Sequence, residues 1–321
     1  MTDADKKRFP NSLLIYNPRS GSALDRDLWL GTIVDKICTT MQHSLIVGAT
    51  TTGVTAADIL KDYLSLKPGL VIAAGGDGTI RHVLGSLAEA EIDIPVGLVP
   101  FGTGNQLARN LKILEEGVFS DPLQHAIDVI SAGHGRRIDI GRMNGNYFCV
   151  AVGAGPLCDA ILTPTQEEKE NWGMLAYVGP MIQYVTSPAV SFRVTADGDS
   201  FEVKALSVIV TNVADMGFAK ISGRAKVDDG FLDLCIITLS EFGDYLKLGF
   251  DVASSMLLGD TPFYIRKAKK IKIESLNGAV KANVDGDPIG GTPMEIEVLP
   301  KAVNILCPKR PIKPLRGRHR A

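Results

Sequence analysis

The sequence is short of cysteine and histidine, and each shortage argues against a class of protein. Five cysteines are scattered along the chain without a CxxC pair, at positions 38, 149, 158, 235 and 307. An odd, dispersed set of this kind argues against a disulfide framework and predicts reduced, buried thiols in a cytoplasmic protein. The five histidines are dispersed as well, which disfavours a zinc enzyme.

A strong charge of one sign and a long apolar run are also missing. The formal net charge is −2, which gives no reason to expect nucleic acid as a partner. The longest apolar stretch, residues 174–190, is interrupted by Gly179, Pro180 and Pro188 and falls short of a membrane span. Residues 1–10 are charged and lead into a strand-like run, so no secretory signal is indicated.

The chain has enough length and apolar content for two domains. It has 321 residues, 45% of them hydrophobic, which is above the size at which a single core usually divides. Up to about residue 140, strands alternate with helices: strands at 13–16, 44–47, 70–74 and 95–99, and helices at 25–41, 54–64 and 80–89. This alternation predicts a doubly wound α/β domain over residues 11–142.

From about residue 145 the pattern changes to strands of alternating polarity. They are expected at 190–195, 201–206, 232–238, 270–274, 280–284 and 294–299, with one amphipathic helix at 241–258. The pattern predicts an antiparallel β-rich second domain over residues 143–300, followed by a basic tail at 311–321.

Two glycine-rich loops follow strands of the first domain. The run at 70–74 leads into Gly75-Gly76-Asp77-Gly78-Thr79, and the strand at 95–99 leads into Pro100-Phe101-Gly102-Thr103-Gly104-Asn105. Glycine lets the backbone approach a ligand, and free N–H groups at a helix N-terminus attract anions. A single loop also suits a plain strand-to-helix connection, but two loops at strand C-termini would line one crevice and predict a phosphate site.

Seven groups of residues occur in an order that matches a known family. They are Asn17–Gly21, Gly75–Thr79, Pro100–Asn105 with Ala108-Arg109, Asp139–Gly141, Gly153–Gly155 with Asp159-Ala160, Asp228–Gly230 and Asp285–Asp287. In this set the chain resembles the diacylglycerol kinase catalytic domain family of bacterial lipid kinases, whose relatives include sphingosine and ceramide kinases. The resemblance covers most of the chain.

The resemblance implies a fold and an activity. The first domain would be similar to those of phosphofructokinase and NAD kinase, with residues 301–310 returning to it, and the second would bind a lipid substrate. The activity would be ATP- and Mg²⁺-dependent transfer of the γ-phosphate to the hydroxyl of a lipid such as diacylglycerol.

Phosphoryl transfer needs a cradle for the nucleotide phosphates, a divalent cation and a group that deprotonates the acceptor. For the cradle, the resemblance points to residues of four loops: Asn17, Pro18, Ser20 and Gly21; Thr50 and Thr51; Gly75, Gly76, Asp77, Gly78, Thr79, Ile80 and Arg81; and Gly102, Thr103 and Asn105. The choice among Thr50, Thr51 and Thr52 stays open, because their spacing to Gly53 departs from the family pattern. Asn17-Pro18 also suits a turn that ends a strand.

The remaining candidates are carboxylates. Asp77 suits Mg²⁺ beside the phosphates and also suits a helix N-cap. The resemblance makes Asp287 the catalytic base, where relatives more often carry Glu, and Asp285 a helper that places the cation or the base. Asp139 is a further cleft candidate, with a structural turn role as the alternative.

A second magnesium site is implied at Asp228–Phe231. There the carboxylate of Asp229 and the main-chain carbonyls of Lys226 and Phe231 would hold a structural ion, since oxygen ligands suit hard cations.

The lipid is harder to infer. Residues 172–184 with Ile161 and Leu162 could line a groove for its tail, although such apolar residues more often form core. Basic residues gather at 266–272 and at 309–320, with no acidic residue after Lys301, so peripheral contact with an anionic inner membrane face is a hypothesis. The identity of the lipid and the oligomeric state, a homodimer included, stay open.

Two other functions compete. An NAD kinase shares the Gly-Gly-Asp-Gly turn, but the second loop has the lipid kinase pattern; a non-catalytic lipid or nucleotide sensor would keep the fold without the activity. A Rossmann dehydrogenase is disfavoured because the first loop is not GxGxxG. The chain also departs from its family at Asn105-Gln106, where relatives often carry Asn-Asp.

Overall fold

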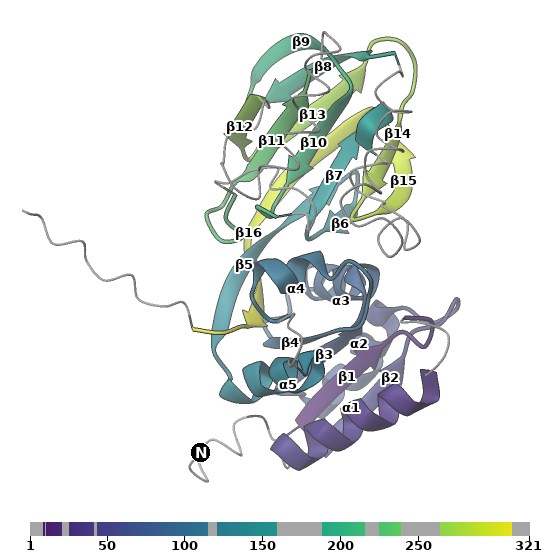
Figure 1. Cartoon of the computed structure of the whole chain (residues 1–321), viewed down its shortest axis with the longest axis vertical. Coiled ribbons are helices and arrows are strands. Elements are labelled where there is room, and N and C mark those ends of the chain that lie inside the picture. The colour runs from purple at the N-terminus through teal and green to yellow at the C-terminus, as the bar shows by residue number, and fades with distance from the viewer. Residues whose placement is uncertain are drawn as a thin grey trace, which may run out of the picture.

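The computed structural model describes residues 9, 11–20, 26–41, 44–114, 121–158, 188–215, 225–238 and 264–309. Four of the predictions lie outside the described residues: the helix at 241–258, the apolar residues 161–162 and 172–184, Gly21, and the basic tail at 311–321. Figure 1 shows two lobes, a helix-rich lobe containing the N-terminal strands and a β-rich lobe above it, joined by two long strands.

The helix-rich lobe is built on four parallel strands. β1 (Asn11–Tyr16), β2 (Ser44–Ala49), β3 (Leu70–Gly75) and β4 (Val96–Pro100) lie in the order β2-β1-β3-β4. The central strand β3 is buried along its whole length, as expected of a parallel strand covered on both faces.

Helices cover both faces of these strands. α1 (Arg26–Met41) and α5 (Pro122–Ala132) share one apolar cluster with one face, while α2 (Ala56–Tyr63), α3 (Asp77–Glu89) and α4 (Gln106–Asn110) share another with the opposite face. A short 3-10 helix, η2 (Leu64–Leu66), follows α2. The predicted doubly wound α/β architecture is confirmed.

The β-rich lobe is a sandwich of antiparallel strands. One layer contains β5 (Gly135–Met143), β6 (Asn146–Phe148), β8 (Val190–Ala196), β9 (Asp199–Ala205), β13 (Lys270–Ser275) and β16 (Met294–Leu306). The other has the order β12-β11-β10-β7-β14-β15, with β7 (Ala151–Ala154), β10 (Ser207–Thr211), β11 (Leu232–Ile237), β12 (Tyr264–Ala268), β14 (Lys281–Val284) and β15 (Asp287–Gly291). Apolar side chains of both layers meet in one cluster, and the predicted antiparallel β-rich fold is confirmed.

The strand β16 differs from its sequence-based prediction. The sequence predicts a strand at 294–299 and a separate segment near 303–307, whereas the structure has one strand of 13 residues with a register shift between Leu299 and Val303. Pro300 lies at this shift, where a residue without an N–H is tolerated. Because β16 pairs with β13 in one lobe and with β4 in the other, a single ten-stranded sheet runs through both lobes.

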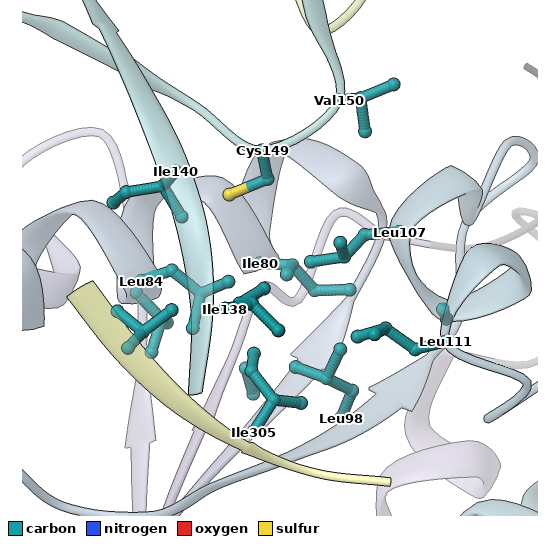
Figure 2. Packing of buried hydrophobic residues seen from close by; sticks show 14 of the residues in the cluster. Ile80, Leu84, Leu98, Leu107, Leu111, Ile138, Ile140, Cys149, Val150 and Ile305 are labelled. Atoms are coloured by element: carbon teal, nitrogen blue, oxygen red, sulfur yellow. The ribbon is translucent and has the colours of Figure 1, made fainter. Parts of the chain in front are cut away.

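An apolar core also joins the lobes. Figure 2 shows Ile80 and Leu84 of α3 and Leu107 of α4 packing towards Ile138 of β5 and Ile305 of β16. Cys149 and Val150, which lead into β7, belong to the same buried cluster. The helices that carry the glycine loops are therefore held between the first sheet and the β-rich lobe.

Two sequence-based expectations about the surface can now be compared with the structure. Four cysteines are buried, as predicted, but Cys38 is exposed on α1, so the prediction of buried thiols was wrong there. Among the described residues, no helix has the length and apolar character needed to cross a bilayer.

Candidate active site

The first glycine loop opens a helix earlier than its sequence suggests. α3 begins at Asp77 with Gly76 as its N-cap, not at residue 80. Asp77 is therefore the first residue of the helix, so the alternative N-cap role does not apply. A Cβ at Gly75 would lie 2.6 Å from Oγ1 of Thr79, so a larger residue would push the threonine out of place.

The second glycine loop lies against the first. A Cβ at Gly102 would come within 2.5 Å of the Cα of Gly76, and one at Gly104 within 2.7 Å of Oδ2 of Asp77. The N–H of Phe101 donates to the carbonyl of Gly75 over 2.8 Å. The glycines of this loop thus allow close contact between the two loops.

Asn105 braces the second loop from within. It adopts a left-handed conformation with φ of 49°. Its amide accepts a hydrogen bond from the N–H of Gly102 at 2.8 Å and donates to the same residue's carbonyl at 2.6 Å. The side chain is therefore occupied inside its own loop.

A pocket of about 440 Å³ lies where β1, β2 and β3 end. Open parallel sheets bind ligands at this edge. Its lining residues are Asn17, Ser20, Thr50, Thr51, Val54, Thr55, Ala56, Gly76, Gly78, Thr79, His82 and Asp287. Three of the four predicted loops and the predicted base therefore meet at one pocket.

Hydroxyl groups line one side of this pocket. Oγ of Ser20 and Oγ1 of Thr79 are 3.4 Å apart, and Oγ1 of Thr50 donates to the carbonyl of Tyr16 at 3.2 Å. Oγ1 of Thr51 accepts from the N–H groups of Gly53 and Val54. Thr50 and Thr51 both reach the pocket, and Thr52 is not among its lining residues.

Four lining residues were not predicted: Val54, Thr55, Ala56 and His82. Thr55 caps α2 in a capping box with Asp58, and its Thr-x-x-Asp pattern resembles a sequence signal for a helix start. His82 is exposed on the second turn of α3. Partial desolvation of the imidazole by neighbouring atoms and the charge of Arg81 lower its pKa below the usual value, against the opposing effect of Asp287.

A tight hairpin brings Asp287 to this pocket from far along the chain. Asp285 and Gly286 both have positive φ, 49° and 96°, as in a type I′ turn that joins β14 to β15. Oδ2 of Asp287 would lie 3.8 Å from a Cβ at Gly78. These residues therefore form a hairpin, and the carboxylate of Asp287 faces the start of α3.

Arg81 holds this hairpin and does not line the pocket. Its guanidinium donates to Oδ2 of Asp287 at 2.7 Å and to the carbonyl of Val284 at 2.6 Å. The arginine side chain is only 5% exposed, whereas that of Asp287 is 56% exposed. A buried cation on α3 therefore fixes the position of an exposed carboxylate on β15.

Asp285 organises the turn instead of facing the pocket. Its carboxylate accepts hydrogen bonds from the N–H groups of Cys149, Val150 and Ala151, at 2.8–2.9 Å. Burial raises its pKa to about 6, against the opposing effects of these N–H groups and of Arg81. These contacts tie the hairpin to the chain that enters β7.

Asp139 likewise has the structural role that the sequence left open. It is fully buried on β5 and accepts hydrogen bonds from the N–H groups of Lys301 and Gly230, each at 2.7 Å. Burial raises the pKa of this carboxyl, and the charges of Asp228 and Asp229 act in the same direction. Asp139 lies beside the register shift of β16, away from the glycine loops.

Several predicted cradle residues lie outside the pocket lining: Pro18, Gly75, Asp77, Ile80, Arg81, Gly102, Thr103 and Asn105. Ile80 points into the core (Figure 2), and its N–H bonds to the carbonyl of Gly76. Neither its side chain nor its N–H is therefore placed to bind phosphate. Thr103 is exposed on the second loop.

Metal ligands are sparse in the described ranges, which contain no group of three or more His, Cys, Asp or Glu side chains placed to hold an ion. At the predicted structural site, Asp229 accepts a hydrogen bond from Nζ of Lys267 at 2.9 Å and from the N–H of Phe231 at 3.2 Å. Nζ of Lys267 also lies 3.0 Å from Oδ2 of Asp233, so this one lysine is shared between two carboxylates. Magnesium held by Asp229, Lys226 and Phe231 stays a prediction.

Comparisons with known proteins agree with this architecture. Residues 11–143 match the family model described as diacylglycerol kinase catalytic domain, and residues 157–307 match the YegS C-terminal NAD kinase beta sandwich-like domain. A diacylglycerol kinase of Bacillus subtilis (strain 168) is 28% identical over 92% of this chain and 96% of its own length. One of Staphylococcus aureus (strain JH9) is 30% identical over 92% of this chain and 91% of its own length.

A solved structure shows the same fold. The crystal structure of a diacylglycerol kinase from Bacillus anthracis str. Sterne superposes with a TM-score of 0.73 at 26% identity, covering 94% of this chain and 98% of the other. The resemblance inferred from the ordered motifs is confirmed, and the chain belongs to the diacylglycerol kinase family of lipid kinases.

Proposed function

We propose that this chain transfers the γ-phosphate of ATP, in the presence of Mg²⁺, to the hydroxyl of a lipid such as diacylglycerol. The observation that carries the proposal is the position of Asp287, which the β14–β15 hairpin brings to the start of α3 at the edge of the pocket. A phosphate donor and an acceptor base are needed within reach of each other for this reaction.

In this proposal the nucleotide phosphates lie at the N-terminus of α3. Its first-turn N–H groups and partial positive charge favour anions, and Gly76 and Gly78, which have no side chain, line the pocket there. The hydroxyls of Ser20 and Thr79 add hydrogen-bond donors around the same space, whereas that of Thr50 donates to the carbonyl of Tyr16.

Asp287 is assigned as the general base. Its exposed carboxylate can receive the proton of the lipid hydroxyl, and Arg81 keeps it oriented from the buried side. Asp285 acts through the turn and does not contact the reactants, because its carboxylate oxygens accept hydrogen bonds from three main-chain N–H groups.

The pocket fits a magnesium ion that is held largely by the nucleotide. Mg²⁺ in kinases usually has one or two carboxylate ligands together with substrate phosphates and water. Asp287 lines the pocket, and Asp77 is the first residue of α3, with its Oδ2 beside Gly104. When bound, the ion would neutralise charge on the transferring phosphoryl group. Asp77 is the residue we assign to hold it.

The remaining parts of the proposal concern organisation. Residues 11–142 with the segment 301–310 would form the nucleotide-binding domain, and residues 143–300 the lipid-binding domain. A cytoplasmic enzyme that touches the inner membrane face peripherally would meet its lipid there, with contact helped by basic residues.

The test is transfer of labelled γ-phosphate from ATP and Mg²⁺ into a panel of micellar lipids, with NAD as a soluble acceptor. We expect label in one lipid. The Asp287→Asn variant should lower kcat by roughly 10²- to 10⁴-fold, the usual contribution of a general base, while leaving KM for ATP nearly unchanged. The control is Asp62→Asn, at an exposed aspartate on α2, which should have no effect.

Three results would contradict the proposal. Label in NAD alone would make the protein a soluble-substrate kinase, and ATP binding without transfer would make it a sensor. A comparable loss of ATP affinity in Asp287→Asn would show that Asp287 binds nucleotide and is not the base.

A further inference from the structure

A second pocket, of about 380 Å³, lies between the two lobes. It shares no lining residue with the pocket at the glycine loops. One wall comes from the end of α4, Arg136 of β5 and the residues that follow β16, and the other from residues 225–227 of the β-rich lobe. Four of its lining residues are basic: Lys112, Arg136, Lys226 and Lys309.

Most of this positive charge is not neutralised. Arg136 forms an ion pair with Asp228 at 2.9 Å. Lys112, Lys226 and Lys309 are exposed, and within the described part of the chain none of them is in an ion pair. Three ammonium groups around one concave site, with no aspartate or glutamate among its lining residues, form a site for an anion.

The sequence that follows Lys309 is also basic. Lys309 is followed by basic residues at positions 310, 313, 316, 318 and 320, and no acidic residue occurs after Lys301. The sequence that leaves the pocket rim therefore has the same sign of charge as the pocket itself.

The pocket is also linked to the glycine loops through α4. This helix of five residues starts after Asn105 in the second glycine loop and ends at Asn110. The side chain of Asn110 donates to the carbonyl of Asp215 at 2.6 Å and accepts from the N–H of the same residue at 3.1 Å. An anion held by Lys112 and Lys226 would bridge the same two lobes that this asparagine joins (Figure 1).

We propose that the pocket formed by Lys112, Arg136, Lys226 and Lys309 binds a phosphate group, separately from the site of phosphoryl transfer. Lysine ammonium groups bind phosphate as point charges. The phosphate can belong to an anionic lipid headgroup or to a small soluble molecule, because both present the same oxygens. This inference goes beyond the proposed kinase activity and does not depend on it.

The experiment has a soluble arm and a bilayer arm, both without ATP. Inorganic phosphate and sn-glycerol 3-phosphate are titrated into the full chain by calorimetry, and sedimentation is measured with phosphatidylcholine vesicles with or without phosphatidylglycerol. The test variant is Lys112→Gln/Lys226→Gln/Lys309→Gln. The matched control is Lys61→Gln/Lys67→Gln/Lys204→Gln, which removes the same charge from exposed lysines elsewhere.

We expect the pocket variant to lose roughly a hundredfold in affinity in at least one arm, as three basic residues would give, and the control to lose about twofold or less. Loss in the vesicle arm alone assigns a lipid headgroup, loss in the soluble arm alone assigns a free phosphate compound, and loss in both assigns a site for either. Equal effects of the two triple variants, or no binding by the unaltered protein in either arm, would overturn the proposal. If the pocket variant does not fold by circular dichroism, Lys226→Gln and Lys204→Gln are compared in the same way, with roughly fivefold loss expected for the first only.

Discussion

Arg81→Met is the change that most directly tests how the candidate base is positioned. Methionine replaces the apolar stem of the side chain and keeps its helix preference, but it removes both guanidinium contacts, one to the carbonyl of Val284 at 2.6 Å and one to Asp287 at 2.7 Å. Among the described residues, strand pairing and the hydrogen bonds of Asp285 and Asn283 would then hold the hairpin at this point.

The expected loss of stability follows from the exposure of the two partners. A hydrogen bond from a charged group to a buried carbonyl contributes about 1.5–3 kcal/mol. The bond to Asp287 adds only about 0.2–1 kcal/mol, because that carboxylate is largely exposed and water can replace the arginine. The loss of these two bonds is partly offset, because the variant no longer has to bury a guanidinium charge. We therefore expect the free energy of unfolding to fall by about 2 kcal/mol.

Catalysis should suffer as well as stability. If the tip of the hairpin shifts, Asp287 no longer faces Gly78, and misplacement of a reacting group by about 1 Å can cost on the order of a hundredfold in rate. We expect kcat for phosphoryl transfer to fall by roughly 10- to 100-fold with little change in KM for ATP, because Arg81 does not line the pocket.

Urea unfolding gives the stability change, and labelled phosphate transfer gives the rate. Arg193→Met is the matched control, since Arg193 forms an exposed ion pair with Glu202 at 2.8 Å on β8 and β9. It should cost less than about 1 kcal/mol and leave kcat unchanged. The reasoning is refuted if Arg81→Met unfolds within about 0.5 kcal/mol of the parent protein and keeps its kcat, or if both variants lose equally.

The other predictions concern buried charge, glycine packing and metal. Burial raises the pKa of Asp285 from 3.8 to about 6. The folded protein therefore gains stability from holding this proton below about pH 4, and its free energy of unfolding falls as the pH rises through 6. In urea unfolding between about pH 4 and 7, the free energy of unfolding of Asp285→Asn should decrease by roughly 1–3 kcal/mol less than that of the parent protein. The same pH dependence in both proteins would contradict the assignment. Gly102→Ala should cost about 1–3 kcal/mol and reduce ATP affinity because its Cβ meets Gly76, whereas Gly31→Ala, with open space around it, should gain about 0.5–1 kcal/mol. If Asp229 holds structural magnesium, chelation should lower the Tm of the parent protein but not of Asp229→Ala; equal responses would leave the contact with Lys267 as its only role.

Much of the candidate site could be predicted because its signals are local. Gly75–Thr79 follows a buried strand, and Asp285-Gly286 has the composition of a two-residue hairpin turn, so both backbone shapes depend on neighbouring residues alone. Thr50 and Thr51 reached the pocket as expected. Val54, Thr55, Ala56 and His82 were missed, because only the packing of α2 beside α3 shows which side of each helix start faces the pocket.

The contacts that the sequence does not indicate join distant parts of the chain. Nothing near Arg81 in the sequence indicates that its side chain bonds to a hairpin about two hundred residues later, where it holds Asp287 and does not line the pocket. In the sequence, nothing distinguishes Asp285 and Asp139 from a catalytic aspartate. In the structure, the carboxylates of both accept hydrogen bonds from main-chain N–H groups.

The sequence by itself determined the order of the elements, the two glycine loops and the membership of a kinase family, because these follow from hydrophobic period, turn composition and ordered motifs. Only the tertiary structure decided that β16 carries one sheet through both lobes, that Asp287 meets the start of α3, and that lysines from both lobes surround a second pocket. The physical reason is that backbone conformation is largely local, whereas the burial of a charge and its partner depend on which distant segments pack together.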